Sequence, residues 1–189
     1  DLLRVLKQLE ANGIVLKLAK CTWCTNVATI MGFEVRCGQG IAADLGKVTD
    51  LCAMKALPTI ASLKSFLGSC VYLSRYIKDF ATLTAPLYEL ERLYKSPATP
   101  LKDKWKSEHQ RAFDGVKSAL VSAPVLAFPD FEKPFILLTD CSDVQKGGVL
   151  LQIDDKGVER PVAYASCRLN EAEKRYPIQA KEATAGIFC

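Results

Sequence analysis

Residues 134–143, Pro-Phe-Ile-Leu-Leu-Thr-Asp-Cys-Ser-Asp, constrain the fold more than any other stretch of the chain. An apolar run of this length, bounded by proline and turn residues, predicts a buried strand. The run ends in two carboxylates, Asp140 and Asp143. A carboxylate at the end of a rigid strand can face a cation. Alternatively, both side chains only close the strand through local backbone hydrogen bonds, and this stretch alone leaves both interpretations open.

Two more strands and a helix are predicted after this stretch. Residues 148–153 and 160–165 have strand-like sequences, and Asp154–Gly157 supplies a turn between them. With the first strand they predict an antiparallel meander of three strands. Residues 178–189 then predict a helix, which carries Glu182. A strand-end Asp and a helical Glu that converge on one point can share Mg²⁺ with the phosphates of a substrate.

A site of this kind needs more acids than the sequence supplies here. Two Mg²⁺ ions about 4 Å apart can activate a water and stabilise the leaving oxygen of a phosphodiester. More than two carboxylates are required, because two cations must be held together against their mutual repulsion. Only seven residues follow Glu182, and none of them is acidic. We therefore expect Asp140 and Glu182 to belong to an incomplete site.

The first part of the chain predicts a helix followed by short strands. Leucines at helical spacing predict a helix over residues 2–9, and Asn12–Gly13 is suited to end it. Residues 14–18 predict a strand. Residues 28–35 and 38–41 predict a short hairpin.

The middle of the chain predicts two helices. The first stops at Pro58, and Thr59 is suited to cap the second. The second carries an apolar stripe at helical spacing, formed by Leu63, Phe66, Leu67, Cys70 and Val71. Such a stripe is typical of a face that packs into a core.

The opposite face of the second helix carries basic and aromatic side chains, namely Lys64, Tyr72, Arg75, Tyr76 and Lys78. Side chains of these two kinds can follow a phosphate backbone and stack on bases or sugars. Taken alone, the pattern also describes an ordinary solvated face. Residues 95–100, with two prolines, predict a linker, and Ser107 with Gln110 predicts a capping box for a further helix.

The composition is that of an ordinary globular protein, with 49% hydrophobic residues, 24% charged residues and a net charge of +4. Mild positive charge is compatible with a polyanionic partner without requiring one. No apolar run approaches the roughly 20 residues that cross a bilayer, so we expect no membrane partner. The chain opens on Asp1 inside a helical pattern, without a secretory signal. We therefore expect a piece of a longer protein.

The eight cysteines are scattered among apolar positions, which predicts reduced and mostly buried thiols in an intracellular protein. Cys21 and Cys24 form the one close pair, and one pair is half of a zinc site. The other possible ligands are Cys37, Cys52 and His109, but nothing in their spacing groups them. Zinc is therefore the weaker interpretation of these residues.

Several segments along the chain follow a family pattern in the same order. They are Gly13–Leu18 with Lys20–Cys21 ("GLKLN..KC"), Met31–Val35 ("FLGH.V"), Leu63–Gly68 with Tyr72–Phe80 ("FLG..NYYRRFI..F"), Ala112–Asp130 ("AF..LK..L..APVL..PD"), Thr139–Ser142 ("TDAS") and Ala163–Ala183 ("AYASR.L...E.RY...EKEALA"). In their collinear succession they resemble the Pol polyprotein of long-terminal-repeat retrotransposons, closest to the gypsy-type branch. The resemblance covers essentially the whole chain.

This resemblance implies an α+β chain of four parts. They are the end of a reverse transcriptase palm with a primer-grip-like hairpin (1–43), a helical thumb (44–95), a linker and connection helix (96–131), and the N-terminal half of a ribonuclease H-like domain (132–189). That last part would be a three-stranded antiparallel sheet followed by a helix. The parent protein would copy RNA into DNA and cleave the RNA of RNA–DNA hybrids.

The resemblance also assigns roles to residues. Asp140 and Glu182 become the first two ribonuclease H carboxylates and ligands of a two-ion Mg²⁺ site, with Asp143 only their neighbour. The predicted contacts to an RNA–DNA hybrid or primer–template are Gly32, Lys64, Tyr72, Arg75, Tyr76 and Lys78, which track the backbone. The remainder of the Pol polyprotein is a further expected partner, and the expected location is a cytoplasmic particle or the nucleus.

The chain departs from the family pattern in several places. The paired polymerase aspartates ("YxDD") and the third and fourth ribonuclease H carboxylates are absent from the sequence, so we expect the chain alone to be inactive. Residues 72–76 lack one aromatic and one arginine of the pattern, Pro177 stands at an N-cap serine position, and Thr184 replaces a core leucine. The alternatives are a non-catalytic nucleic-acid-binding or scaffold remnant, and a purely structural helical module, which would show no salt-dependent binding to a hybrid.

Overall fold

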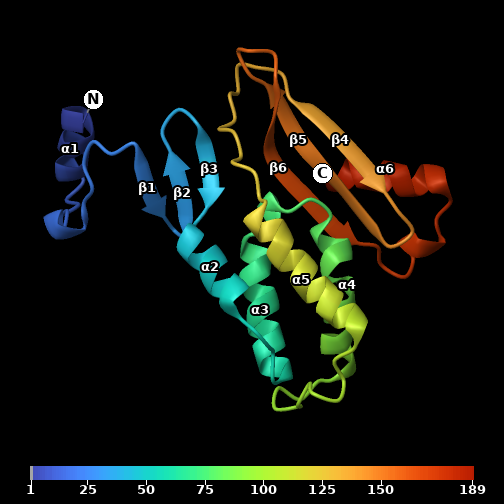
Figure 1. The fold of residues 1–189 in the computed structure, drawn as a ribbon. Helices are drawn as coiled ribbons and strands as arrows, with labels where there is room; N and C mark the ends of the chain where they lie inside the picture. Colours follow the sequence, from blue (N-terminus) through green and yellow to red (C-terminus); the bar gives the residue numbers. More distant parts are fainter. Residues whose placement is uncertain (1) are drawn as a thin grey trace.

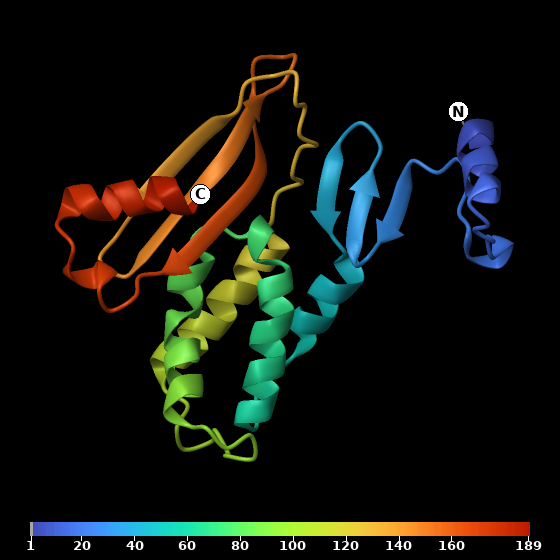
Figure 2. The same ribbon diagram turned by 180° about the vertical axis from the view of Figure 1, so that it is seen from behind.

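The computed structural model describes residues 2–189 and confirms the predicted α+β class (Figure 1). Its two sheets each have three antiparallel strands, in the orders β1-β2-β3 and β4-β5-β6. The elements are α1 (Leu2–Ala11), η1 (Leu18–Lys20), β1 (Val27–Ile30), β2 (Phe33–Arg36), β3 (Gly40–Ala43), α2 (Leu45–Ala53), α3 (Ile60–Tyr72), η2 (Ser74–Tyr76), α4 (Phe80–Leu93), α5 (Ser107–Val121), β4 (Ile136–Cys141), β5 (Gln145–Ile153), β6 (Glu159–Arg168), η3 (Glu173–Arg175) and α6 (Ile178–Phe188). We call β1–β3 the first sheet, β4–β6 the second sheet, and α2–α5 with η2 the helical unit. From either side, the helical unit lies between and below the two sheets (Figures 1 and 2).

Helix α1 ends where the sequence predicts, but the strand expected after it does not form. Gly13 has a positive φ of 67°, and the amide of Ile14 donates to the carbonyl oxygen of Leu9, as in a glycine-terminated helix. The strand predicted over residues 14–18 is wrong, because Val15 is 93% exposed and the segment joins no sheet. A short apolar run becomes a strand only when a neighbouring strand pairs with it, and none lies beside it in the described part.

In the first sheet, a tight turn divides the predicted strand 28–35 into β1 and β2, and β2 pairs with β3 as the predicted hairpin. Its β1–β2 turn is Met31–Gly32, and both residues have positive φ, at 51° and 77°. Positive φ at both central residues is the geometry of the two-residue turns that match strand twist. The hydroxyl of Tyr72, in α3, donates a hydrogen bond to the carbonyl oxygen of Met31 in this turn. The turn is therefore held closely against the helical unit.

The helical unit forms around the predicted apolar stripe of α3. Thr59 caps this helix as predicted: its Oγ1 accepts from the amide of Ser62, and its own amide donates to Ser62 Oγ. The stripe is buried with one exception, since Val71 is 48% exposed. Phe66 meets Phe113 of α5 with ring centroids 4.8 Å apart, so α5 shares this core.

Two predictions for segments of the helical unit, a capping box and a linker, differ in detail from the structure. The capping box predicted for Ser107 and Gln110 is wrong by one residue, because the amide of Lys106 donates to Nδ1 of His109 and Ser107 already lies inside α5. The proline-rich segment 95–100, predicted to be a linker or domain boundary, is a loop between α4 and α5, which pack against each other in one core. It contacts the start of α3, where the amide of Ile60 donates to the carbonyl oxygen of Thr99. This bond gives a partner to an amide that has none within the helix.

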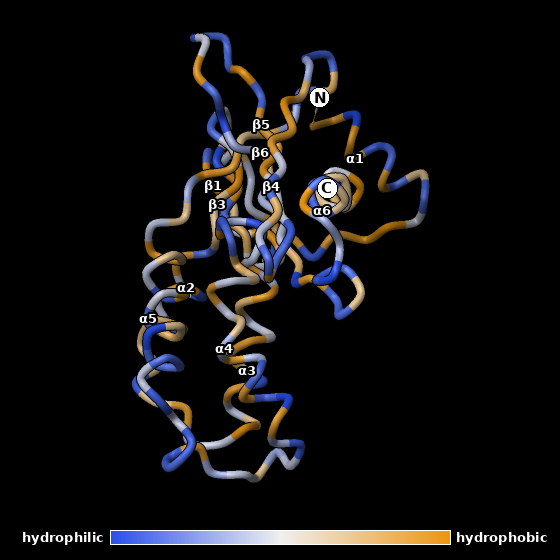
Figure 3. Tube along the Cα trace, turned by 90° about the vertical axis from the view of Figure 1, so that its right-hand side faces the viewer, coloured by the Kyte–Doolittle hydropathy of each residue, from blue (hydrophilic) through white to orange (hydrophobic). Residues whose placement is uncertain are grey.

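The second sheet confirms the predicted three-stranded meander, with α6 lying along one face of β4 and β5. Seen from the side, α6 appears end-on beside β4 (Figure 3). The expectation that β4 is buried is wrong, because Leu137 and Leu138 are 44% and 52% exposed. The reason is its place at the edge of the sheet, with a neighbour on one side only. Apolar sequence predicts a strand but not its position in the sheet.

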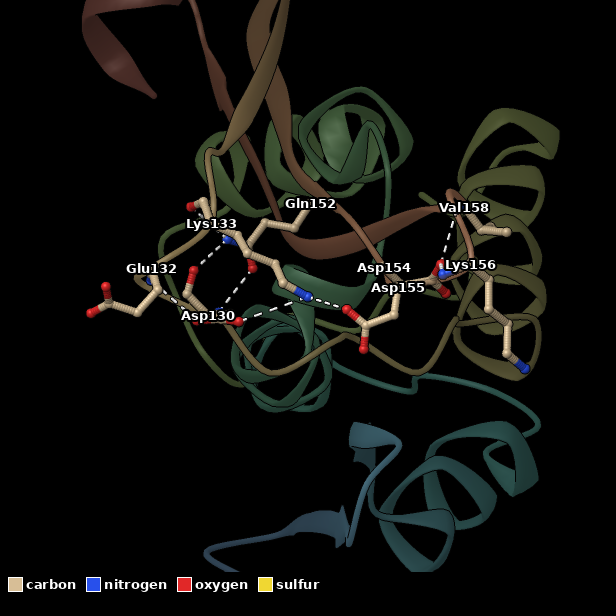
Figure 4. Close-up of polar contacts among 8 residues, drawn as sticks. All are labelled: Asp130, Glu132, Lys133, Gln152, Asp154, Asp155, Lys156 and Val158. Atoms are coloured by element: carbon tan, nitrogen blue, oxygen red, sulfur yellow. Dashed lines mark hydrogen bonds and ion pairs between the residues drawn. The ribbon is translucent and has the colours of Figure 1, made fainter.

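The far end of the second sheet is closed by a polar cluster (Figure 4). Lys133 Nζ lies 2.5 Å from Asp155 Oδ1, which raises the pKa of Lys133. The buried side chain of Gln152 accepts from the amide of Asp130 and donates to its carbonyl oxygen. The Asp154 carboxylate accepts backbone hydrogen bonds in the predicted turn, and these lower its pKa. The cluster fixes the β5–β6 turn to the segment before β4.

None of the helices in residues 2–189 is both long enough and apolar enough to span a bilayer. All eight cysteines are free thiols, as predicted, but the expectation that most are buried is wrong. Only Cys70 is buried, on the core face of α3, whereas Cys24, Cys37 and Cys167 are among the exposed ones.

The difference in burial between Cys70 and Cys167 predicts that a thiol reagent modifies the two cysteines at different rates. Burial raises the pKa of Cys70 to about 12, and alkylating agents react with the thiolate. At pH 8 and at pH 9 we expect iodoacetamide to modify Cys167 and to leave Cys70 unmodified until the protein is unfolded in urea. Peptide mass spectrometry measures both sites in one sample, and modification of Cys70 at the rate of Cys167 in the native protein would contradict the packing of α3.

Candidate nucleic-acid and metal site

A hollow of about 170 Å³ lies between the helical unit and the second sheet. Its polar lining comes from both sides, with Lys78 and Asp79 from the helical unit and Asp140, Ser142 and Gln145 from the sheet. We call it the inter-unit hollow. It contains the strand-end carboxylate that the sequence singled out.

The register of the sheet explains why Asp140 faces this hollow. Directly paired residues of an antiparallel ladder share one face. Asp140 pairs with Gly147, and Gly147 pairs with Ser166, whose Oγ accepts from an amide of α4. Cys141 pairs with Lys146 on the opposite face, where Lys146 Nζ lies 5.6 Å from an aromatic ring of α6. Asp140 therefore points toward the helical unit and away from α6.

Glu182 belongs to α6 and approaches from the other face of the sheet. Burial raises the pKa of the Cys141 thiol, and the negative charges of Glu182 and Asp140 raise it further. Both carboxylates thus lie near Cys141, the last residue of β4. The structure brings the two predicted ligands to one end of one strand, but from opposite faces.

Asp143 is engaged by a lysine. Lys181 Nζ lies 2.7 Å from Asp143 Oδ1, and this contact lowers the pKa of Asp143. The β4–β5 turn is closed by Ser142 instead, whose Oγ accepts from the amides of Val144 and Gln145. The local turn-closing role that one interpretation gave to the aspartates therefore belongs to Ser142.

The residues described here do not complete a metal centre. Among residues 2–189, no three His, Cys, Asp or Glu side chains are grouped so that they could hold a metal ion. Asp140 and Glu182 supply two carboxylates, and a pair of Mg²⁺ ions needs more negative charge than that. No metal-dependent step follows from these residues alone.

A second group of predicted contacts lies where the first sheet meets α3. The ring of Phe33, next to Gly32, stacks on Tyr72 with centroids 4.7 Å apart. Lys47 Nζ lies 4.4 Å from the centre of the Tyr72 ring, and the Arg75 guanidinium lies 5.7 Å from that of Phe33. The sequence singled out Gly32, Tyr72 and Arg75, and it missed Phe33 and Lys47. Phe33 follows the turn glycine directly, whereas no local pattern marks Lys47.

The remaining predicted contacts are separated from one another. Lys64 lies 3.7 Å from Glu91 of α4 in an ion pair. Lys78 lines the inter-unit hollow with Asp140. Tyr76 is only 1% exposed, and its ring packs into the core of the helical unit. We therefore correct the prediction for Tyr76, because a ring buried in this way is not available to stack on nucleic acid.

The buried hydroxyl of Tyr76 leads to a prediction. Within residues 2–189 it is the one buried side-chain oxygen or nitrogen without a hydrogen-bond partner, and a buried unpaired hydroxyl costs free energy. Tyr76→Phe should leave the free energy of unfolding unchanged or raise it by about 1 kcal/mol. Urea unfolding followed by circular dichroism measures the change. A loss of more than 1 kcal/mol would show that the hydroxyl has a partner.

The C-terminal part of this arrangement matches a known class of domain. Residues 105–189 match the family described as the RNase H-like domain found in reverse transcriptase. This matched part of the chain includes α5, the second sheet with Asp140, and α6, so it is similar to an RNase H-like domain of the reverse transcriptase type.

The whole chain is related to Pol polyproteins of retrotransposons and retroviruses, of which it corresponds to a part. It is 35% identical over 97% of its length to the retrovirus-related Pol polyprotein from transposon opus of Drosophila melanogaster, and it spans 19% of that protein. It is 34% identical over 96% of its length to the Gag-Pol polyprotein of Woolly monkey sarcoma virus, and it spans 10% of that protein.

A solved structure shows the same fold. The foamy viral protease-reverse transcriptase in complex with an RNA/DNA hybrid superposes with a TM-score of 0.82, covering 98% of this chain and 24% of that one. The two sequences are 24% identical in the superposed part. The likeness extends over both sheets and the helical unit, and it shows a shared fold.

Proposed function

We propose that this chain is the part of a Pol polyprotein that holds an RNA–DNA hybrid or primer–template against the helical unit and the second sheet. The observation that carries the proposal is the group formed by Phe33, Tyr72, Lys47 and Arg75. Lys47 and Arg75 are exposed, and among the described residues neither has a carboxylate partner. Unpaired cations beside the exposed ring of Tyr72 and the half-buried ring of Phe33 favour binding to a phosphate backbone.

The likeness to a foamy viral enzyme solved with an RNA/DNA hybrid supports this proposal. In the parent polyprotein, the associated activities would be RNA-directed DNA synthesis and cleavage of the RNA strand of the hybrid. Asp140 and Glu182 would contribute to a Mg²⁺ site that carboxylates from other parts of the polyprotein complete. The same proposal places the protein inside the cell, in a cytoplasmic particle or the nucleus, where nucleic acid is copied.

A non-catalytic role in binding or scaffolding is the second candidate. It is favoured by the approach of Asp140 and Glu182 from opposite faces of the sheet, and by the pairing of Asp143 with Lys181. A chain that only holds the hybrid needs the cationic and aromatic group but no metal centre. The two candidates share the binding step and differ in cleavage.

Binding is tested by the affinity of the chain for an RNA–DNA hybrid at several salt concentrations. We expect the dissociation constant to rise with salt, because cations of the protein displace condensed counterions from the phosphates. Arg75→Ala should reduce the slope of log K against log salt by about 1. Arg111→Ala, at an exposed position on α5, is the matched control and should leave it unchanged. Binding that does not respond to salt would contradict the proposal and favour a purely structural module.

Cleavage is tested on the same substrate with Mg²⁺. We expect the isolated chain to leave the RNA strand intact, because its described residues do not group three metal ligands. Gel analysis of end-labelled RNA measures this directly. Mg²⁺-dependent cleavage that Asp140→Asn abolishes would overturn the expected inactivity, and it would exclude the non-catalytic candidate at the same time.

A further inference from the structure

A second hollow, of about 320 Å³, lies between the α2–α3 loop and the α4–α5 loop of the helical unit. The α4–α5 loop is at the end of the unit that points away from the second sheet (Figure 1). Residues 55–58 of the first loop form one wall, and Leu101, Lys102 and Trp105 of the second loop form another. We call this the loop hollow. Its volume is within the range of about 300–1,000 Å³ that is usual for ligand pockets.

The deepest part of the loop hollow is apolar and firmly packed. Leu57, Leu101 and Phe113 line it and are 8%, 1% and 1% exposed. The half-buried ring of Trp105 lies edge-on to Phe113, with centroids 5.9 Å apart. The indole nitrogen of Trp105 donates to Gln110 Oε1 at 2.8 Å, which fixes the ring. Such a packed, desolvated pocket favours a partner that inserts one large apolar side chain.

The rim of the loop hollow is positively charged. Its charged lining side chains are Lys55 and Lys102, which are both exposed. Among residues 2–189 neither of them has an ion-pair partner. Residues 94–106 carry four lysines and one aspartate, so the loop itself has an excess of positive charge. Charge complementarity therefore favours an acidic partner.

The α2–α3 loop also offers free backbone groups beside the loop hollow. In the part of the chain that the structure describes, the amides and carbonyl oxygens of residues 55–57 form no hydrogen bond with another backbone group. The residues that follow are paired, since the amide of Leu101 donates to the carbonyl oxygen of Pro58. An extended peptide can pair with free amides and carbonyls of this kind. A nucleic acid lacks the matching alternation of donors and acceptors along its backbone.

The loop hollow is separate from the group proposed to bind nucleic acid. It borders the residues just before α3, whereas Tyr72 is the last residue of that helix. The length of α3 places about 18 Å between the two ends. Occupation of one site therefore does not require occupation of the other.

We propose that the loop hollow is a docking site for an acidic, extended segment of a partner protein. One leucine or aromatic side chain of that segment enters between Leu57 and Trp105. Carboxylates on either side of this anchor pair with Lys55 and Lys102, and the backbone of the segment pairs with residues 55–57. This interaction surface is additional to nucleic-acid binding and does not depend on it.

A second copy of the chain is a less suitable occupant. Its best matching segment is Phe131, which is 81% exposed and lies between Asp130 and Glu132. The Asp130 carboxylate, however, already accepts from the amide of Glu132 and lies 3.8 Å from Lys133 Nζ. The Phe131 ring also packs against Phe135, with centroids 6.0 Å apart. A contact from this segment to the loop hollow of another copy would be head-to-tail, which a symmetric dimer cannot form.

The docking site is tested by the fluorescence anisotropy of the fluorescein-labelled peptide SDEFEDS, titrated with the full chain. We expect saturable binding, a loss of about tenfold for the peptide SDEAEDS, which lacks the anchor, and no binding of the basic peptide SKRFKRS. Lys55→Ala and Lys102→Ala should each weaken binding about threefold, as for exposed ion pairs. The matched control is Lys156→Ala, at an exposed position of the β5–β6 turn, which should not change it. No saturable binding, or equal losses for all three variants, would overturn the docking site.

The place of the bound peptide is read from the two tryptophans of the chain. In a nitrogen–proton correlation spectrum, SDEFEDS should shift the indole signal of Trp105, which lines the loop hollow. The indole of Trp23, in the segment before β1, should keep its position, and Trp23→Phe assigns the two signals. An unchanged Trp105 signal with the peptide bound would overturn the assigned place.

Competition distinguishes the possible occupants. A saturating RNA–DNA hybrid should leave the peptide bound, whereas displacement would assign the loop hollow to nucleic acid and overturn the docking site. Concentration-dependent self-association that Phe131→Ala and Lys102→Ala both abolish would assign it to a second copy and also overturn the proposal. If the chain binds the peptide but not the hybrid, the docking site stands and the proposed function fails.

Discussion

The bonds from the first turn of α4 to Gln145 and Ser166 join the two halves of the molecule. A helix start leaves four amides without partners inside the helix, and a side-chain cap is worth about 1 kcal/mol. Here the N-cap carboxylate of Asp79 is turned to Gln145 instead of its own helix. The second sheet therefore supplies the side-chain acceptors at the start of α4, while the amides of Thr82 and Leu83 also donate to the carbonyl oxygen of Asp79.

The same contact determines which side chains share the inter-unit hollow. Because Gln145 and Ser166 lie on the face that carries Asp140, fixing α4 to that face brings Lys78 beside the carboxylate. The opposite face carries α6 and Glu182. A site built across an edge strand in this way has one acid on each face and lacks the further carboxylates that a pair of Mg²⁺ ions requires.

Local sequence patterns were sufficient to predict the elements whose formation depends on residues nearby in the sequence. The N-cap at Thr59, four of the five residues of the buried α3 stripe and the three-stranded meander are confirmed. Features that depend on distant partners were not predictable: residues 14–18 lack a strand to pair with, and the exposure of β4 follows from its edge position. Tyr76 is buried although it lies beyond the end of the α3 stripe. The hydrogen bond from Thr82 to Gln145 spans 63 positions of the sequence, and the one from Ala81 to Ser166 spans 85. No local motif marks such pairs.

The account depends most directly on the hydrogen bonds from the amides of Ala81 and Thr82 to Ser166 and Gln145. Hydrogen exchange measures the protection of each of these amides. The amides of Ala81 and Thr82 should exchange slowly in the wild-type chain, although they lie in the first turn of a helix. Replacing Ser166 with Ala should increase exchange at Ala81 by about tenfold, while amides in the middle of α3 keep their protection. Fast exchange at Ala81 and Thr82 in the wild-type chain would contradict the account, because it would show that these two amides are not bonded to the second sheet in solution.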